Sequence, residues 1–467
     1  MKTLSLLISF TLLNGCVHFQ EQPLSPSVSF SQLEARSLQQ ADLQQFIANY
    51  QHGSKPSSQW NLDRLSLAAL YFHPDLALAR AQDDSAEAAT LTAAQHPNPS
   101  LAISPFWISN IAAAMPWIFA SSLSVPIETA GKRGYRMTRS QHLTEAAELR
   151  ITDTAWQIRG RLRLALLDVY AANETLRLLQ QQAGIGQSLN ISLQQQLAAG
   201  EIAHADVLAA QLALEQTQLN VTAAQKKQVE SLDLLAAAIG VPATAVQGIA
   251  LDFSEFSQFP HFDHSQFEQL KKTALHERSD LKAARSDYEA AQSALQLEIA
   301  NQYPNLQANP GYTRNILENR WGLGITALQL PIFNQNEGPI AEMEAKRREL
   351  AVRFEALQLR ILGEIDRAHA ALLAAHQRLT VAEQQWLNRS DYLHTTQALV
   401  AAGELDQSAL KIAELALSIA ERAHLDVQVE NQQALAQLEI ALRYTVNLPM
   451  PPSMSSATQK KNPNAIQ

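Results

Sequence analysis

The chain has few cysteines, few glycines and little charge, and each shortage excludes a class of protein. A single cysteine among 467 residues excludes a disulfide framework and a cysteine-based zinc site. The net charge is −9 and no face dense in lysine and arginine appears, so nucleic acid is not an expected partner. Only 16 glycines occur, whereas alanine, leucine and glutamine dominate long stretches. This composition favours helices over compact α/β folds.

Long apolar runs are also missing. After residue 15 no run reaches the roughly 18 apolar residues that a membrane-spanning helix needs. Before it, Lys2 and the apolar run Leu4–Leu13 are typical of a secretory signal. The signal ends in Asn14-Gly15-Cys16, which resembles the lipobox of bacterial lipoproteins.

This resemblance implies that residues 1–15 are removed and that Cys16 carries acyl chains. An ordinary cleaved signal with a cysteine nearby by chance is the alternative. Lipidation is favoured because a lone thiol would otherwise be unpaired in an oxidising compartment. Val17 follows the cysteine, which by resemblance fits sorting to the outer membrane.

From about residue 60 onward, the sequence pattern of one long segment recurs in a second segment. Ala-Ala-Gly-Glu at 198–201 recurs at 401–404, and Pro97-Asn98 recurs as Pro304-Asn305. Matches in one order at a nearly constant offset indicate an internal duplication of a long unit. The predicted division is a signal peptide 1–15, a lipidated linker 16–60, a first repeat 61–242, an inter-repeat linker 243–266, a second repeat 267–449 and a tail 450–467.

Each repeat is predicted to contain a helix, a β-hairpin, a long helix and a second helix. The first copy places them at 62–95, 100–126, 131–199 and 202–239, and the second at 267–301, 306–331, 338–402 and 405–445. The long helix would extend about 100 Å. The two shorter helices together match its length, so we expect them to stack end to end along it.

The hairpins carry the pattern of membrane strands. Leu306, Ala308 and Tyr312 alternate with Gln307 and Asn309. Apolar residues on one face and polar residues on the other, with aromatics near the ends, are typical of transmembrane β-barrel strands. The first hairpin is more apolar. A soluble ribbon packed on helices is the alternative. Four strands cannot close a barrel in lipid, whereas three chains would supply twelve, so membrane insertion predicts a trimer.

Three motifs resemble the TolC family of outer-membrane efflux channels, in particular its CzcC-like lipoprotein branch. Pro126–Arg133 (PIETAGKR) and Leu330–Ala341 (LPIFNQNEGPIA) resemble that branch's two strand-to-helix joints, and Gly200 with Asp206-Val207-Leu208 resembles the family's tip motif. The resemblance implies a trimeric twelve-stranded outer-membrane β-barrel continued by a periplasmic α-barrel of long antiparallel helices. Ala409, which replaces the tip aspartate in the second copy, departs from the pattern.

Site residues follow from the resemblance. The joints are predicted to use Pro126, Glu128, Gly131, Lys132, Arg133, Pro331, Asn334, Asn336 and Gly338. The periplasmic tip or aperture is predicted to use Gly200, Glu201, Asp206, Gly403, Glu404 and Asp406. Carboxylates after each glycine also favour the helix dipole, so a purely structural role is the alternative.

The sequence pattern indicates no catalytic constellation and no metal or cofactor site. His261 and His264 lie in the inter-repeat linker without further ligands, which favours a solvated linker over a metal site. The predicted function is a lipid-anchored, passive exit duct of the bacterial outer membrane. It would act with a periplasmic adaptor and an inner-membrane pump of the RND type, with heavy-metal cations as the implied cargo. A lipid-anchored coiled-coil scaffold or adhesin is the alternative.

Overall fold

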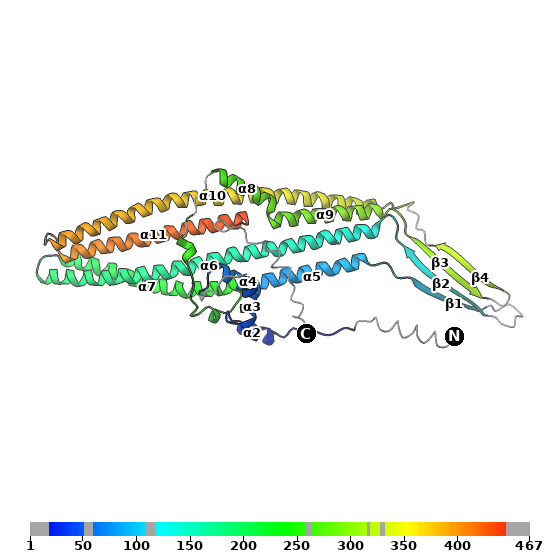
Figure 1. The fold of residues 1–467 in the computed structure, drawn as a ribbon, viewed down its shortest axis with the longest axis horizontal. Helices are drawn as coiled ribbons and strands as arrows, with labels where there is room; N and C mark the ends of the chain where they lie inside the picture. Colours follow the sequence, from blue (N-terminus) through cyan, green and yellow to red (C-terminus); the bar gives the residue numbers. More distant parts are fainter. Residues whose placement is uncertain are drawn as a thin grey trace.

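The computed structural model describes residues 18–50, 59–107, 117–257, 259, 264–314, 318–326 and 332–444. It is a long bundle of helices with one small sheet at one end (Figure 1). None of its described helices is long and apolar enough to cross a membrane. The predicted combination of long antiparallel helices with four strands is confirmed.

Two repeats of the same element order make up the bundle. The first contains α4 (Leu62–Phe72), α5 (Pro74–Ala94), β1 (Ser100–Trp107), β2 (Trp117–Ile127), α6 (Lys132–Ala198) and α7 (His204–Ile239). The second contains α8 (His264–Glu277), α9 (Ser279–Ala300), β3 (Leu306–Arg314), β4 (Asn319–Thr326), α10 (Glu337–Ala401) and α11 (Gln407–Leu442).

The long helices organise the packing. Helix α6 contacts α5, α7, α9 and α11, whereas α10 contacts α9 and α11. In Figure 1, α5 and α9 lie along the halves of α6 and α10 nearest the sheet, and α7 and α11 lie along the far halves. Leu162, Leu166 and Leu167 of α6 are almost fully buried in the core around the middle of the bundle.

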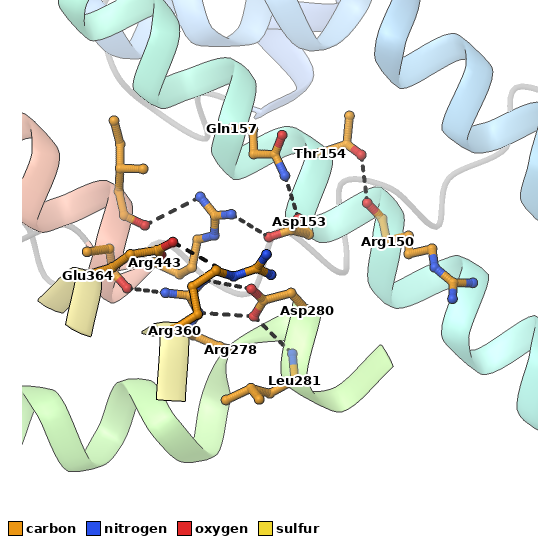
Figure 2. A network of polar contacts seen from close by, with 12 residues as sticks. Arg150, Asp153, Thr154, Gln157, Arg278, Asp280, Leu281, Arg360, Glu364 and Arg443 are labelled. Carbon is orange, nitrogen blue, oxygen red and sulfur yellow. Dashed lines mark hydrogen bonds and ion pairs between the residues drawn. The ribbon is translucent and has the colours of Figure 1, made fainter. Parts of the chain in front are cut away.

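The prediction of single helices over 62–95 and 267–301 is wrong, because each is broken once. His73 is extended (φ −67°, ψ 126°) before Pro74, which has no N–H to continue the helix. Arg278 takes the same conformation (φ −57°, ψ 128°) without a proline. Its guanidinium donates to both carboxylate oxygens of Asp280, at 3.0 and 2.6 Å, and to the carbonyl of Ala441 (Figure 2).

Part of the segment predicted as a linker over 16–60 is packed. The segment contains α2 (Pro26–Glu34), none of whose residues is buried, and α3 (Ala41–Tyr50), which is packed. Leu38, Leu43 and Ile47 are at most 3% exposed and join the core of the first repeat. The spacing of Leu43 and Ile47 puts both on one face of α3, so this segment buries apolar surface instead of remaining solvated. Cys16 lies outside the described residues.

The segment between the repeats also contributes to the core. It contains two short 3-10 helices, η1 (Ala243–Ala245) and η2 (Ser254–Ser257), and Phe256 is 3% exposed. The side chain of Gln432 in α11 donates to the Phe256 carbonyl at 2.9 Å. His264 begins α8, and His261 lies outside the described residues.

The sheet joins the two repeats. Its strand order is β1-β2-β3-β4, and every neighbouring pair is antiparallel. The central pair unites β2 of the first repeat with β3 of the second, from Phe119 opposite Arg314 to Ile127 opposite Leu306. Residues 108–116, 315–317 and 327–331, which belong to the predicted hairpins, lie outside the described residues.

Candidate functional site

The sheet has one apolar face. Residues opposite each other in an antiparallel pair point to the same side, so the register assigns each residue to a face. One face carries large apolar side chains that are between 40% and 82% exposed: Leu101, Ile103, Trp107, Trp117, Phe119, Leu123, Ile127, Trp321, Leu323 and Ile325. A contiguous exposed apolar surface of this kind requires a nonaqueous environment or a partner.

The opposite face is made of small or polar residues. These are Ser100, Ala102, Ser104, Ala120, Ser122, Ser124, Gln307, Asn309, Gly311, Thr313, Gly322 and Gly324. Phe106 and Ile118, which face each other across β1 and β2, and Pro126 are the exceptions on this face. Ser121, Arg314 and Asn319 are the polar exceptions on the apolar face. The sheet is therefore two-sided in the manner of a barrel wall with a polar interior.

Aromatic pairs lie near the free end of each hairpin. The rings of Trp107 and Trp117 are 4.9 Å apart, and those of Tyr312 and Trp321 are 4.7 Å apart, between centroids. Rings at the ends of apolar strands are characteristic of the interface between lipid and water.

The first joint follows β2 and bends through two left-handed residues, Ala130 (φ 55°) and Gly131 (φ 71°). Lys132 is only 6% exposed. Its Nζ donates to the Tyr303 carbonyl at 2.6 Å and to Asn305 Oδ1 at 2.8 Å. Burial lowers the pKa of Lys132. The start of the first long helix is thus tied to the segment between α9 and β3 in the second repeat.

Two further cations hold this joint. Arg133 Nε donates to the Ala94 carbonyl at 2.7 Å. Arg136 forms a two-pronged ion pair with Glu128, with one hydrogen bond of 2.9 Å between Nη2 and Oε2. The hydrogen bonds from Arg136 lower the pKa of Glu128. Both cations therefore have partners within the joint, in line with a structural role.

The second joint achieves the same bend with a different residue. Asn336 precedes α10 in the left-handed conformation (φ 63°), as Gly131 precedes α6. Its backbone N–H donates to Asn334 Oδ1 at 2.8 Å, and its side chain donates to the Glu298 carbonyl at 2.7 Å. Asparagine tolerates this conformation better than most residues. Gly338 lies in the first turn of α10, with open space where a side chain would be, and Pro331 lies outside the described residues.

The two helix tips lie at the end of the bundle farthest from the sheet (Figure 1). Gly200 and Gly403 are left-handed, with φ of 79° and 80°. The N–H of Glu201 donates to the Gln196 carbonyl at 3.0 Å, and that of Glu404 to the Leu399 carbonyl at 2.9 Å. Both turns use the same glycine-dependent way of ending a helix. Both glutamates are exposed.

The two tip aspartates occupy different helical positions. Asp206 is the third residue of α7 and accepts from the Ala203 N–H at 3.1 Å. Asp406 is the N-cap of α11 and accepts from the Ala409 N–H at 2.9 Å. Each supplies one half of a capping box. Asp406 also accepts from Ser408 and Gln196, and these bonds, led by that from Ala409, lower its pKa.

Some of these partners were not predicted. Asn305, which binds Lys132, belongs to the repeated Pro-Asn pair, so the duplication did mark it. Gln196 carried no sequence signal, because one glutamine in a glutamine-rich helix is not distinctive. Over the described ranges, no group of three or more histidine, cysteine, aspartate or glutamate side chains could hold a metal ion.

Comparison with protein families identifies the family of this chain. Residues 65–241 and 270–442 match the family described as outer membrane efflux protein. The chain belongs to the outer membrane efflux protein family. The two matched segments correspond to the two repeats, and the predicted resemblance to outer-membrane efflux channels is confirmed. A transport family also supports the expectation that the chain is not an enzyme.

Relatives of this efflux-family chain include the cobalt-zinc-cadmium resistance protein CzcC of Cupriavidus metallidurans, 24% identical over 267 residues. That match covers 56% of this chain and 61% of CzcC, less than two thirds of the relative. Solved structures with the same fold include the outer-membrane channel OprN (TM-score 0.66, 17% identity, 82% of this chain and 89% of OprN). The outer membrane protein VceC of Vibrio cholerae is similar (TM-score 0.65, 19% identity, 82% and 95%).

Proposed function

We propose that this protein is the outer-membrane channel component of a tripartite efflux system and acts as a passive exit duct. One observation carries the proposal: an exposed apolar sheet face, backed by a small and polar face, at the end of a long helical rod. Lipid would cover the apolar face and water the other. Membership of the efflux family supports this function.

The duct would be a homotrimer. Strands β1 and β4 form the two edges of the described sheet, and β4 runs antiparallel to β1. A ring of copies can therefore continue one antiparallel sheet, with β4 of each copy beside β1 of the next. An open edge is not tolerated in lipid, so closure is required. Three copies give twelve strands, which are enough for a water-filled passage.

Exposed apolar residues on the helices support a matching α-barrel. On α10, Val352, Leu359, Leu373 and Leu387 recur at multiples of seven residues and are 43–73% exposed. A heptad stripe of this kind packs against a neighbouring helix. Such packing would continue the membrane barrel as a periplasmic rod.

The tips are proposed as the periplasmic aperture, where an adaptor protein and an RND-type inner-membrane pump would dock. Gly200, Glu201, Asp206, Gly403, Glu404 and Asp406 gather at this end, and three copies would place their carboxylates in a ring. Acidic rings attract cations. The similarity to a cobalt-zinc-cadmium resistance protein supports heavy-metal cations as cargo.

Lipidation at Cys16 is proposed as a second membrane attachment, and it leads to a test against the scaffold alternative. Removing the acyl chains with Cys16→Ala should leave the protein in the outer-membrane fraction, with a heat-modifiable band on gels, because the barrel holds it there. Release of the variant into the periplasmic fraction would instead support a lipid-anchored scaffold or adhesin.

Conductance tests the duct directly. Purified trimeric protein should form pores in a planar lipid bilayer, and a vesicle preparation without protein is the control. Trimeric material that gives no conductance would overturn the proposal.

A further inference from the structure

The segment between the repeats is attached to the seam where α6 of the first repeat meets α11 of the second. It reaches the seam through η2. Phe256 is 3% exposed, and the centroid of its ring lies 5.8 Å from that of Tyr170 in α6. The side chain of Gln432 in α11 donates to the Phe256 carbonyl at 2.9 Å. The short helix η2 therefore contacts both helices of the seam.

Glu255 of η2 places its carboxylate beside this seam. Its Oε1 atom is buried, and within the described part of the chain no group donates a hydrogen bond to it. The Nε atom of Arg163 is likewise buried without an acceptor among the described residues. The charged groups that act on Glu255 come from three helices: Asp63 of α4, Arg159 and Arg163 of α6, and Glu439 of α11.

Both arginines of this cluster already have a carboxylate partner. Arg163 forms the buried ion pair with Glu439, and the two side chains are 6% and 5% exposed. Its Nη2 also donates to Gln432 Oε1 at 3.3 Å. Nη2 of Arg159 lies 3.7 Å from Oδ1 of Asp63. Three carboxylates therefore share two cations, and Glu255 is the carboxylate in excess.

This excess makes the attachment of η2 depend on protonation. A buried carboxylate without a cation or a donor of its own is costly, so the attached segment favours the neutral acid. Burial raises the pKa of Glu255 to about 7, against the attraction of Arg163 and Arg159. Once the segment leaves the seam, water solvates the carboxylate and its pKa returns to the ordinary value near 4.5. Loss of the proton is therefore coupled to release of the segment.

We propose that Glu255 is a proton-binding site that holds the inter-repeat segment on the seam between the two repeats. With the proton bound, residues 254–257 stay attached beside Gln432. Loss of the proton favours their release, which uncovers Gln432 and the ring of Tyr170. Every group of this site belongs to one copy, so the site does not depend on the proposed trimer.

Amide hydrogen exchange of the purified full chain in detergent measures the release. A carboxyl group with a pKa near 4.5 when released and about 7 when attached predicts an increase of about 50-fold in the released fraction from pH 5 to pH 7.5. Peptides covering residues 252–257 should show this rise, after correction for the exchange rate of an unstructured chain at each pH. Amides of Ile361 and Ile365, in the core of the second repeat, should show no such rise.

Glu255→Gln keeps the size of the side chain and cannot ionise. The released fraction of this variant should therefore be the same at pH 5 and pH 7.5. Glu355→Gln is the matched control, because Glu355 is an exposed glutamate on α10. It should keep the full rise of the wild type.

Gln432→Ala distinguishes a proton-binding site from a structural contact. This variant removes the hydrogen bond to the Phe256 carbonyl and leaves Glu255 able to ionise. Exchange of residues 252–257 should therefore increase at both pH values by a similar factor, with the pH dependence retained.

Three results would overturn the proton-binding site. The first is a wild-type segment whose corrected exchange does not change between pH 5 and pH 7.5. The second is a Glu255→Gln variant that behaves like Gln432→Ala, since Glu255 would then be a structural contact only. The third is a rise shared by Ile361 and Ile365, which would indicate global unfolding instead of local release. None of these results bears on the duct, which is tested by its conductance.

Discussion

The two repeats use different residues to bond the backbone carbonyls beside the break in their first helix. Both break their first helix at equivalent positions, His73 and Arg278, next to the end of the last helix of the repeat. In the second repeat Arg278 itself donates to the Ala441 carbonyl near the end of α11. In the first, Arg36 donates to the carbonyls of Gly240 and Phe72, at 2.8 and 2.9 Å.

This difference shows what the N-terminal segment does for the fold. Carbonyls at helix ends lack partners within the helix and must find them elsewhere. In the second repeat the donor, Arg278, belongs to the repeat itself. In the first repeat the donor, Arg36, lies in the segment that precedes the repeat. The first repeat therefore depends on the segment around α3, and the second does not.

The largest effect is expected where the two repeats meet. Arg163 and Glu439 are 6% and 5% exposed and form a buried ion pair. Arg163→Leu would remove the buried cation that faces the Glu439 carboxylate and should lower the free energy of unfolding by about 3–5 kcal/mol, measured by denaturant titration. The double variant Arg163→Leu with Glu439→Leu should recover most of this loss. If it is as unstable as the single variant, the buried Glu439 charge is not the cause.

The helix breaks give the next largest effect. Arg278→Ala removes the two hydrogen bonds of its guanidinium to the Asp280 carboxylate and should cost about 3 kcal/mol, whereas Arg36→Ala removes bonds to neutral carbonyls and should cost about 2 kcal/mol. Amide hydrogen exchange should rise at the end of α11 in the first variant and at the end of α7 in the second. Loss of protection at both ends in both variants would show that the repeats do not differ in this way.

The segment that joins the repeats should add a pH dependence to the stability of the fold through Glu255. Burial raises the pKa of Glu255 from 4.5 to about 7, against the attraction of Arg163 and Arg159. The folded chain then binds a proton that the unfolded chain releases, so this contribution is complete below pH 4.5 and is lost as pH rises to about 7.

Glu255→Gln should remove the loss of stability that ionisation of Glu255 causes at high pH. The variant should be more stable than wild type at pH 8, by about 3 kcal/mol, and similar at pH 4. Thermal unfolding at the two pH values measures the difference. An equal gain at both values would contradict the titration of Glu255.

The smallest effect concerns the tips, where each repeat holds the opposite half of a capping box. Asp406→Ala should cost about 1 kcal/mol locally and Asp206→Ala about half as much, read as faster hydrogen exchange at the start of α11 and α7. Because the pKa of Asp406 is lowered, its contribution is present above pH 3.8 and is lost as pH falls through the folded pKa.

A double variant tests whether the capping bond itself stabilises the second tip. In the Asp406→Ala background, Ala409→Asp gives the second repeat the arrangement of the first and should restore part of the protection. Failure to restore any would indicate that the bonds of Asp406 to Ser408 and Gln196, and not its capping bond, stabilise the tip.

Prediction from sequence succeeded where local rules dominate. Period-two alternation identified the second hairpin, and Gly200 and Gly403 marked both tips. It failed at Arg278, because an extended residue without proline has no local signature. It also failed for Leu38 and Ile47, whose burial depends on helices far away in the sequence.

The sequence alone therefore determined the duplication, the helical rods, the two-sided strands and the family, since periodicity and punctuation are properties of neighbouring residues. Only the tertiary structure decided that Lys132 is bound by the other repeat, that Asn336 replaces Gly131, and that Gly160 is covered while Gly363 is open. These facts depend on which helix faces lie against each other, and the free energy of that packing is shared among residues about 200 positions apart.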